Sequence, residues 1–145
     1  MLPDPERLQV WREFLTAHAA MEKMLARELQ SEFDLQLPWF EVMDALASNE
    51  GSMRFNDLAE RTMANPSSLS RQIDKLEERH YVARERATGD DGRAVEIVLT
   101  KRGHDVWRQA NPGYYRIVRR VFTNSLTETD VIALNRIFGK VLEAD

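Results

Sequence analysis

Hydroxyl and basic side chains gather in one short stretch of the sequence, PSSLSRQIDK at residues 66–75. On a helix, Arg71 and Lys75 are about one turn apart and share a face with serines, opposite apolar side chains. The N-terminus of a helix attracts phosphate, and the donors of an arginine match guanine O6 and N7. The pattern fits either a DNA-contacting face or an ordinary solvated face, made of Ser67, Ser68, Ser70, Arg71 and Lys75.

The residues before this stretch predict how its helix, over residues 66–79, begins. Asn65 is a good N-cap residue, and Pro66 suits the first helical position because its missing N–H is not needed there. A shorter helix over residues 55–62, which Asn56 can cap, ends only three residues upstream. Two helices joined by so short a turn form a helix-turn-helix unit.

A β-hairpin is predicted directly after these helices. Residues 82–86 and 95–99 alternate in the manner of strands, and the loop between them is polar and contains glycine. Arg84 and Arg86 on the first strand and Arg93 in the loop make the hairpin basic. A helix-turn-helix followed by a basic hairpin has the order of a winged helix, which favours DNA binding over a merely solvated helix face.

Charge is unevenly distributed along the chain. The net charge of the 145 residues is −4, which by itself argues weakly against a nucleic-acid partner. Residues 1–60 carry a net charge of −7, whereas residues 61–104 carry +2 and residues 105–145 carry +1. The middle segment, where the helix-turn-helix and hairpin are predicted, is thus the most positive, and DNA binding through it should weaken steeply with salt.

Other kinds of chemistry find little support in the sequence. There is no cysteine, so disulfides, thiol nucleophiles and thiolate metal sites are excluded. His18, His80 and His104 are widely spaced and form no catalytic or metal-binding motif. We expect no catalytic residue, no metal and no cofactor, and hence no enzyme. No apolar run is long enough to cross a bilayer and no signal-peptide pattern occurs, so we expect a cytoplasmic protein without a membrane partner.

Amphipathic helices are predicted at both ends of the chain, over residues 6–32 and, after the capping motif TETD, over residues 127–145. Further helices are predicted over residues 39–48 and from residue 101, the latter with a kink or break at Pro112. The terminal apolar stripes exceed what a winged helix can bury, which favours a homodimer over a helical pair within a monomer. The side chains expected in the dimer interface are Leu8, Leu15, Val131, Leu134, Phe138 and Val141.

Residues 55–106 resemble the winged helix of the MarR (multiple antibiotic resistance regulator) family of bacterial transcription factors. The motifs LAER, SSLSRQIDKLEERHYVAR and DGRAVEIVLTKRG occur in the order and spacing of that family. The resemblance implies a mainly α-helical fold with a small β-hairpin wing (α+β): two helices, an optional short strand, two helices, two strands and two helices. It implies one MarR-type domain over residues 1–145, with a winged helix-turn-helix lobe at 38–100 and a helical dimerisation region at 5–34 and 101–145.

The resemblance also implies a mode of action. A two-fold dimer would bind a near-palindromic operator in double-stranded DNA, as a repressor. In the family a wing-tip arginine enters the minor groove and an aspartate two residues earlier steadies it; these are Arg93 and Asp91 here, while Gly92 stands where many members have a basic residue. The residues expected to contact DNA are Asn65, Ser67, Ser68, Ser70, Arg71, Lys75, Arg84, Arg86, Asp91 and Arg93.

Many members of the family respond to small aromatic acids or phenols bound between the dimer helices and the DNA-binding lobe. By resemblance, a small-molecule effector would contact Trp11, Phe14, His18, Trp39 and Met43, and release the repressor. The same residues fit an ordinary core at helical spacing, which we favour. The alternative to a regulator is a helical interaction protein that keeps the winged-helix fold and has lost DNA binding, in which charge reversal of Arg71 or Arg93 would leave function intact.

Overall fold

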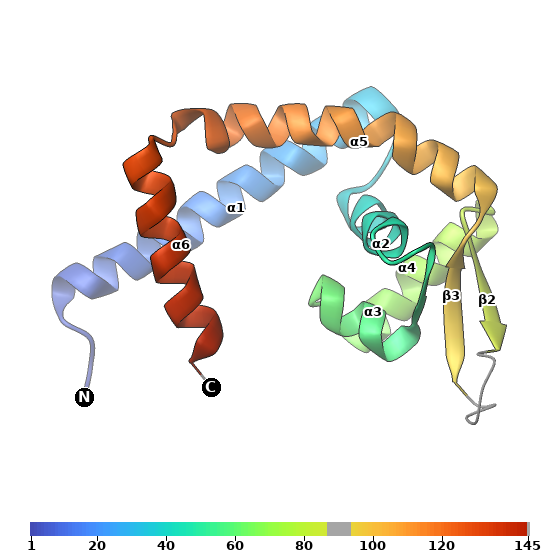
Figure 1. Cartoon of the computed structure of the whole chain (residues 1–145), viewed down its shortest axis with the longest axis horizontal. Helices are drawn as coiled ribbons and strands as arrows, with labels where there is room; N and C mark the ends of the chain where they lie inside the picture. Colours follow the sequence, from blue (N-terminus) through green and yellow to red (C-terminus); the bar gives the residue numbers. More distant parts are fainter. Residues whose placement is uncertain (87–93, 145) are drawn as a thin grey trace. The chain divides into compact units, whose positions relative to one another are not determined.

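The computed structural model describes residues 1–86 and 94–144 (Figure 1). The chain packs into two compact units, each described by itself below: the terminal unit, residues 1–25 and 115–145, and the winged lobe, residues 26–114. The longest helices, α1 (Pro5–Phe33) and α5 (Lys101–Val121), each contribute to both units. The predicted organisation as one domain, with a winged helix-turn-helix lobe at 38–100 and a dimerisation region at 5–34 and 101–145, stays a prediction.

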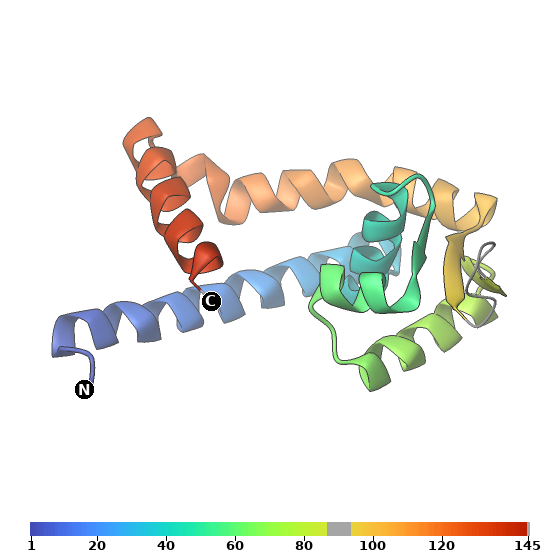
Figure 2. The ribbon, with the colours of Figure 1, turned by 60° about the horizontal axis from the view of Figure 1, so that its bottom comes forward.

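The winged lobe is mainly helical and carries one small sheet. Between the end of α1 and the start of α5, its elements are α2 (Leu37–Ala47), β1 (Ser52–Arg54), α3 (Phe55–Thr62), α4 (Pro66–Glu78), β2 (Val82–Arg86) and β3 (Val95–Leu99). A loop of three residues joins α3 to α4, and the sheet lies beside α4 (Figures 1 and 2). The predicted fold class and order of elements are confirmed, including the optional first strand.

The sheet is antiparallel, with strand order β1-β3-β2. Ile97 of the central strand β3 lies opposite Met53 of β1 and Arg84 of β2, and its side chain is fully buried. β2 is consequently an edge strand, and its outer edge lies against α4.

The core of the winged lobe is formed by α2 against α3 and α4. α2 is buried along most of its length, with Trp39, Phe40 and Met43 among its buried side chains. α3 and α4 contribute one apolar face each, which is the arrangement that helical spacing of apolar residues produces. Their buried side chains are Leu58, Leu69, Ile73 and Leu76. This packing turns the serine- and arginine-bearing face of α4 away from the core.

One predicted cap in the lobe is wrong. Asn56 lies inside the first turn of α3, whose N-cap is Arg54, and the side chain of Arg54 makes no capping hydrogen bond. The reason is that β1 extends to Arg54, so the chain leaves the sheet and enters the helix at Phe55 without an intervening turn. Thr100 caps α5, since its Oγ1 accepts a hydrogen bond from the backbone N of Gly103 at 3.0 Å.

Helix α5 runs without interruption from Lys101 to Val121 although it contains Pro112. The sequence predicts either a kink or a break at Pro112, and the continuous helix excludes the break. The first turn of α5 also passes very close to the end of α4, because Gly103 has no Cβ. A Cβ at this position would overlap the backbone carbonyl oxygen of Tyr81.

The terminal unit contains the first turns of α1, the end of α5, a 3-10 turn η1 (Thr123–Ser125) and α6 (Glu128–Glu143). Thr127 and Asp130 form the predicted capping box: Oγ1 of Thr127 accepts from the backbone N of Asp130 at 3.1 Å, and the backbone N of Thr127 donates to Oδ2 of Asp130 at 2.9 Å. Phe14 of α1 packs edge-on against Phe138 of α6, with ring centroids 6.5 Å apart. No helix within the described residues has the length and apolar character needed to span a membrane.

Candidate nucleic-acid interface

The N-terminus of α4 is built as the sequence predicts. Oδ1 of Asn65 accepts hydrogen bonds from the backbone N of Ser67 at 2.9 Å and of Ser68 at 3.4 Å, and Pro66 has no N–H to satisfy. Asn65 therefore already occupies two of the orphan donors of this helix. Asn65 therefore acts as a helix cap. Because it already binds these two amides, an anion at this end of α4 would contact serine hydroxyls instead.

One face of α4 is available to a partner. Arg71 and Lys75 are exposed, and Ser67 is exposed one turn before Arg71. Ser68 and Ser70 are half-buried at the two sides of this face. In the described part of the chain, neither Arg71 nor Lys75 has an ion-pair partner. Two such cations one turn apart can bind phosphate oxygens or the edges of bases.

Helix α2 holds one flank of α4. Nε1 of Trp39 donates a hydrogen bond of 2.8 Å to Oε1 of Gln72, and the guanidinium of Arg79 lies 5.3 Å from the centre of the Trp39 ring. Gln72 and Arg79 are two turns apart and so lie on the same side of α4. Because Trp39 is only 5% exposed, these contacts fix the rotation of α4 about its own axis.

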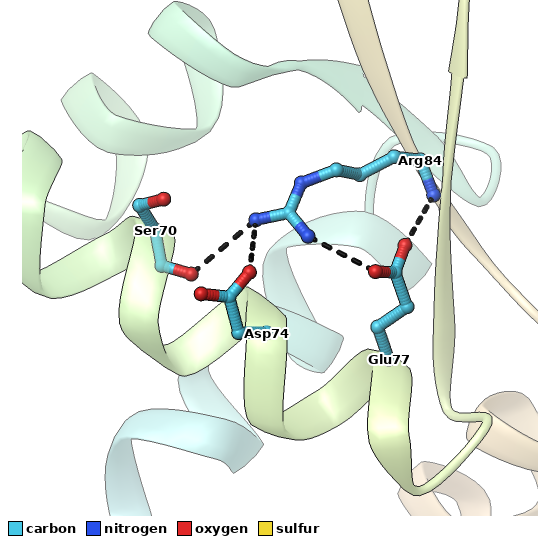
Figure 3. A network of polar contacts seen from close by, with 4 residues as sticks. All are labelled: Ser70, Asp74, Glu77 and Arg84. Carbon is cyan, nitrogen blue, oxygen red and sulfur yellow. Dashed lines mark hydrogen bonds and ion pairs between the residues drawn. The ribbon is translucent and has the colours of Figure 1, made fainter.

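The wing holds the opposite flank of α4 through Arg84 (Figure 3). Its guanidinium lies 2.7 Å from Oδ1 of Asp74 and 3.1 Å from Oε1 of Glu77, and donates to the carbonyl oxygen of Ser70 at 3.4 Å. The backbone N of Arg84 donates to the other oxygen of the Glu77 carboxylate, Oε2, at 3.2 Å. The predicted contact between Arg84 and DNA would compete with these bonds.

The remaining predicted wing residues are only partly described. Arg86 is exposed at the end of β2. Asp91 and Arg93 lie outside the described residues, so their predicted roles at the wing tip stay predictions.

A hollow of about 600 Å³ opens where the wing meets the start of α3. Its lining includes Arg54, Asn56, Ser70 and Arg84. Arg54 is exposed at the N-terminus of α3, where its charge adds to that of the helix end, while Asp57 in the first turn of α3 also lines the hollow and offsets part of this charge. Arg54 could not be identified as a site residue from the sequence, because a single arginine beside a turn forms no pattern.

Known proteins with a similar sequence and fold decide the family. The sequence profile of the MarR family matches residues 33–94. The chain is 30% identical to AbsC, a MarR family transcriptional regulator from Streptomyces coelicolor, and the two structures agree with a TM-score of 0.89 over 99% of this chain and 96% of AbsC. The chain belongs to the MarR family of transcriptional regulators.

Two further relatives of this MarR family member bear on its function. Sco3205, a MarR family transcriptional regulator from Streptomyces coelicolor whose crystal structure is a complex with DNA, is 28% identical, with a TM-score of 0.90 over 99% of this chain and 89% of Sco3205. The HTH-type transcriptional repressor MdtR of Bacillus subtilis (strain 168) is 28% identical over 100 residues, which are 69% of this chain and 63% of MdtR. The chain thus matches less than two thirds of MdtR. The prediction of a DNA-binding transcriptional regulator is confirmed at the level of this class.

The predicted effector contacts of the MarR family member fall into two groups. Trp11, Phe14 and His18 form an exposed row on α1 in the terminal unit, with centroid distances of 6.2 Å and 6.5 Å between successive rings. Trp39 and Met43 belong to the core of the winged lobe, where Met43 is fully buried and Trp39 contacts α4. A common effector pocket for all five stays a prediction.

The predicted dimer contacts lie on the terminal unit, and four of them are exposed on the single chain: Leu15, Val131, Phe138 and Val141. Leu8 and Leu134 are half-buried. Other apolar side chains are exposed on the same helices, among them Val10, Trp11, Phe14, Ile132, Ile137 and Leu142. Apolar surface gathered in this way on two helices is typical of a face that another protein surface covers.

No site for a metal ion is evident in the described residues, because no three His, Cys, Asp or Glu side chains come together in a group that could hold one. The side chains that the structure does bring together around α4 are hydrogen-bonding and charged groups suited to binding. Asp74 and Glu77 are among those that no sequence pattern identifies.

Proposed function

We propose that this MarR family member is a dimeric, sequence-specific DNA-binding repressor that recognises a near-palindromic operator. The observation that carries the proposal is the exposed face of α4, with Ser67, Arg71 and Lys75, held between α2 on one flank and the wing on the other. A helix positioned in this way can enter the major groove while the wing follows the backbone beside it.

The relatives support both parts of this proposal. Sco3205 was crystallised with DNA and shares the fold over almost the whole chain, and MdtR is a transcriptional repressor. A regulator of this kind acts where the chromosome lies, so the predicted cytoplasmic location is part of the proposal.

The predicted contacts other than Asn65 and Arg84 have the following roles in this proposal. Arg71 reads a guanine or binds a phosphate, Lys75 binds a phosphate, and the serine hydroxyls bind phosphate oxygens at the helix end. Arg86 adds positive charge on the wing, and at its tip Arg93 enters the minor groove with Asp91 steadying it.

The proposed dimer explains the exposed apolar face of α1 and α6. Two copies related by a two-fold axis would cover Leu15, Phe138 and Val141 of each chain. Their two α4 helices would then read half-sites about 34 Å apart, which is one turn of the duplex. An operator with two-fold symmetry is therefore expected.

The proposal also includes a small-molecule effector that binds on α1. The exposed row of Trp11, Phe14 and His18 offers flat apolar surface with one polar end, which suits a small aromatic acid or phenol. Its binding would release the operator by changing the separation of the two α4 helices. Titration with salicylate, read by Trp fluorescence and by operator affinity, tests this: no change in either quantity up to millimolar salicylate contradicts it for that class of ligand.

The experiment that tests DNA recognition begins with selection of an operator from a random-sequence duplex pool. Binding of the selected duplex is then measured by fluorescence anisotropy for the parent protein, Arg71→Ala, Arg93→Ala and the control Lys140→Ala, which changes an exposed cation on α6. Loss of affinity in the two arginine variants alone supports the proposal. Selection of no sequence at low salt, or unchanged affinity in both arginine variants, would mean that the fold is used for protein interactions.

A further inference from the structure

The acidic side chains of α4 divide into two groups that differ in their partners. Asp74 and Glu77 lie on the flank that faces β2 and are both paired with Arg84. Glu78 is exposed on the same helix and has no ion-pair partner among the described residues. Any carboxylate on a helix that approaches DNA repels phosphate, so attraction to DNA does not explain why Asp74 and Glu77 are on α4. Their pairing with Arg84 suggests a structural role instead.

Glu77 contacts Arg84 with both carboxylate oxygens. Oε1 lies 3.1 Å from the guanidinium, while Oε2 accepts the backbone N–H at 3.2 Å. β2 is an edge strand, so this N–H has no partner within the sheet. One side chain of α4 thus holds both the backbone and the side chain of the same wing residue.

The guanidinium of Arg84 contacts three groups of α4. Besides Glu77 it contacts Asp74 at 2.7 Å and the carbonyl oxygen of Ser70 at 3.4 Å, and its side chain is only 30% exposed. Its Nη1 and Nη2 atoms thus face protein acceptors, and a DNA phosphate that approaches this end of the guanidinium would have to displace charge-assisted bonds, which are among the stronger hydrogen bonds in proteins.

We propose that Arg84 is a positioning residue for DNA binding: through Glu77 and Asp74 it locks β2 against α4, and it does not itself bind phosphate. The proposal rests on the proposed DNA binding and gives Arg84 a positioning role in place of the DNA contact predicted from the sequence. Arg84 lies two residues before Arg86, where β2 ends. Holding Arg84 in place therefore fixes β2, the first strand of the wing, relative to the exposed face of α4.

The decisive variant is Glu77→Gln, because the two roles of Arg84 predict opposite results. If Arg84 positions the wing, Glu77→Gln removes one of its two carboxylate partners and so weakens the attachment of β2 to α4. Affinity for the selected operator duplex then falls about five- to tenfold, because the arrangement that binds DNA is less populated. If Arg84 binds phosphate, Glu77→Gln releases it for that contact and removes a repelling charge, so affinity rises. Glu78→Gln is the matched control, with affinity unchanged or raised.

Arg84→Lys also distinguishes a positioning role of Arg84 from a phosphate contact. Lysine keeps the positive charge but lacks the planar fork that reaches Asp74 and Glu77 together, so a positioning role predicts a loss similar to that of Glu77→Gln. A phosphate contact predicts that most of the affinity is retained. The double variant Arg84→Lys with Glu77→Gln should be no weaker than the more affected single variant, since both changes break one unit; additive losses overturn the proposal.

A measurement without DNA keeps this proposal separate from the proposed function. Amide hydrogen exchange over residues 82–86 of the free protein should accelerate in Glu77→Gln and not in Glu78→Gln, while circular dichroism and the melting temperature verify that both remain folded. Unchanged exchange overturns the proposed lock even if DNA binding is affected. If exchange accelerates in Glu77→Gln but the parent protein selects no DNA sequence, the contact between β2 and α4 exists as proposed and the proposed function is wrong.

Discussion

The indole Nε1 of Trp39 lies 2.8 Å from Oε1 of Gln72 and ties α2 to α4. Trp39→Phe keeps an aromatic ring in the core but removes the donor, and it weakens the contact with Arg79 because indole is the best partner of a cation. We expect the free energy of unfolding to fall by about 1–2 kcal/mol, measured by urea denaturation. Combining Trp39→Phe with Gln72→Leu should cost less than Trp39→Phe alone, since no amide oxygen is then left unpaired; a larger loss in the double variant would contradict this.

His80 occupies the left-handed position after α4, with φ 62°. The backbone N of Tyr81 donates to the carbonyl of Leu76 and that of His80 to the carbonyl of Glu77, the two hydrogen bonds of a Schellman motif. Since glycine adopts this conformation without strain, His80→Gly should raise the free energy of unfolding by about 0.5–1 kcal/mol. The control Glu78→Gly, inside the last turn of α4, should lower it by about 1 kcal/mol. A lower melting temperature in His80→Gly would contradict the expectation.

Gly103 allows the start of α5 to approach the carbonyl of Tyr81. Gly103→Ala should destabilise the fold by about 1–3 kcal/mol, because a Cβ overlaps backbone that flexible side chains cannot relieve. The control Gly139→Ala, in α6, has no atom within 4 Å of the new Cβ and should be neutral or stabilising by up to about 1 kcal/mol. Thermal melts of the two variants should therefore shift in opposite directions or differ by several degrees, and equal shifts would refute the close approach.

The elements of this fold could be predicted because their signals are local. The Asn65 cap joins a side chain to amides two and three residues further on, and the capping box at Thr127 spans three residues, so spacing alone identifies both. β1 was only optional, since it is three residues long and pairs with β3 more than forty residues away. The Asn56 cap failed for the same reason: the strand that moves the helix start to Phe55 is defined by that distant pairing.

The candidate site could be predicted as a face but not as a set of contacts. The helical period alone places Ser67, Arg71 and Lys75 together on α4. Arg84, however, meets Glu77 and Asp74 only because β2 folds back along α4, and this return depends on the packing of the whole lobe. The sequence therefore predicts a DNA contact for Arg84, and it gives no sign that Asp74 and Glu77 lie within ion-pair distance of this arginine.

Trp39 shows the same limit for the predicted effector pocket. An aromatic residue at helical spacing has no mark that tells a ligand contact from a core contact. Its partners, Gln72 and Arg79, lie 33 and 40 residues further along the chain, beyond the reach of any local pattern.

The capping box of α6 should make stability depend on pH in the acid range. Hydrogen bonds from the backbone N–H and from the hydroxyl of Thr127 lower the pKa of Asp130 below its ordinary value of 3.8. The ionised carboxylate thus stabilises the folded chain above pH 3.8, and this contribution is lost as the pH falls through the lower pKa of the folded state. Asp130→Asn should reduce the fall in melting temperature between pH 5 and pH 2.5. An identical pH profile in Asp130→Asn and the parent would contradict the role of this carboxylate.

Val141 gives the sharpest test of the proposed dimer, because it is 64% exposed on the single chain. If the protein were a monomer, Val141→Glu would alter the free energy of unfolding by no more than about 0.5 kcal/mol, as other surface changes do. In a dimer that covers α1 and α6, the same change buries an unpaired charge at a cost of several kcal/mol. We expect Val141→Glu to shift the sedimentation equilibrium toward monomer and to lower operator affinity at least about tenfold, since one α4 alone reads only half of a symmetric site. Lys140 is exposed about 100° around the helix from Val141 and outside the predicted stripe, so Lys140→Glu should leave the assembly intact. If the two variants sediment alike, the apolar face of α6 is not the dimer interface.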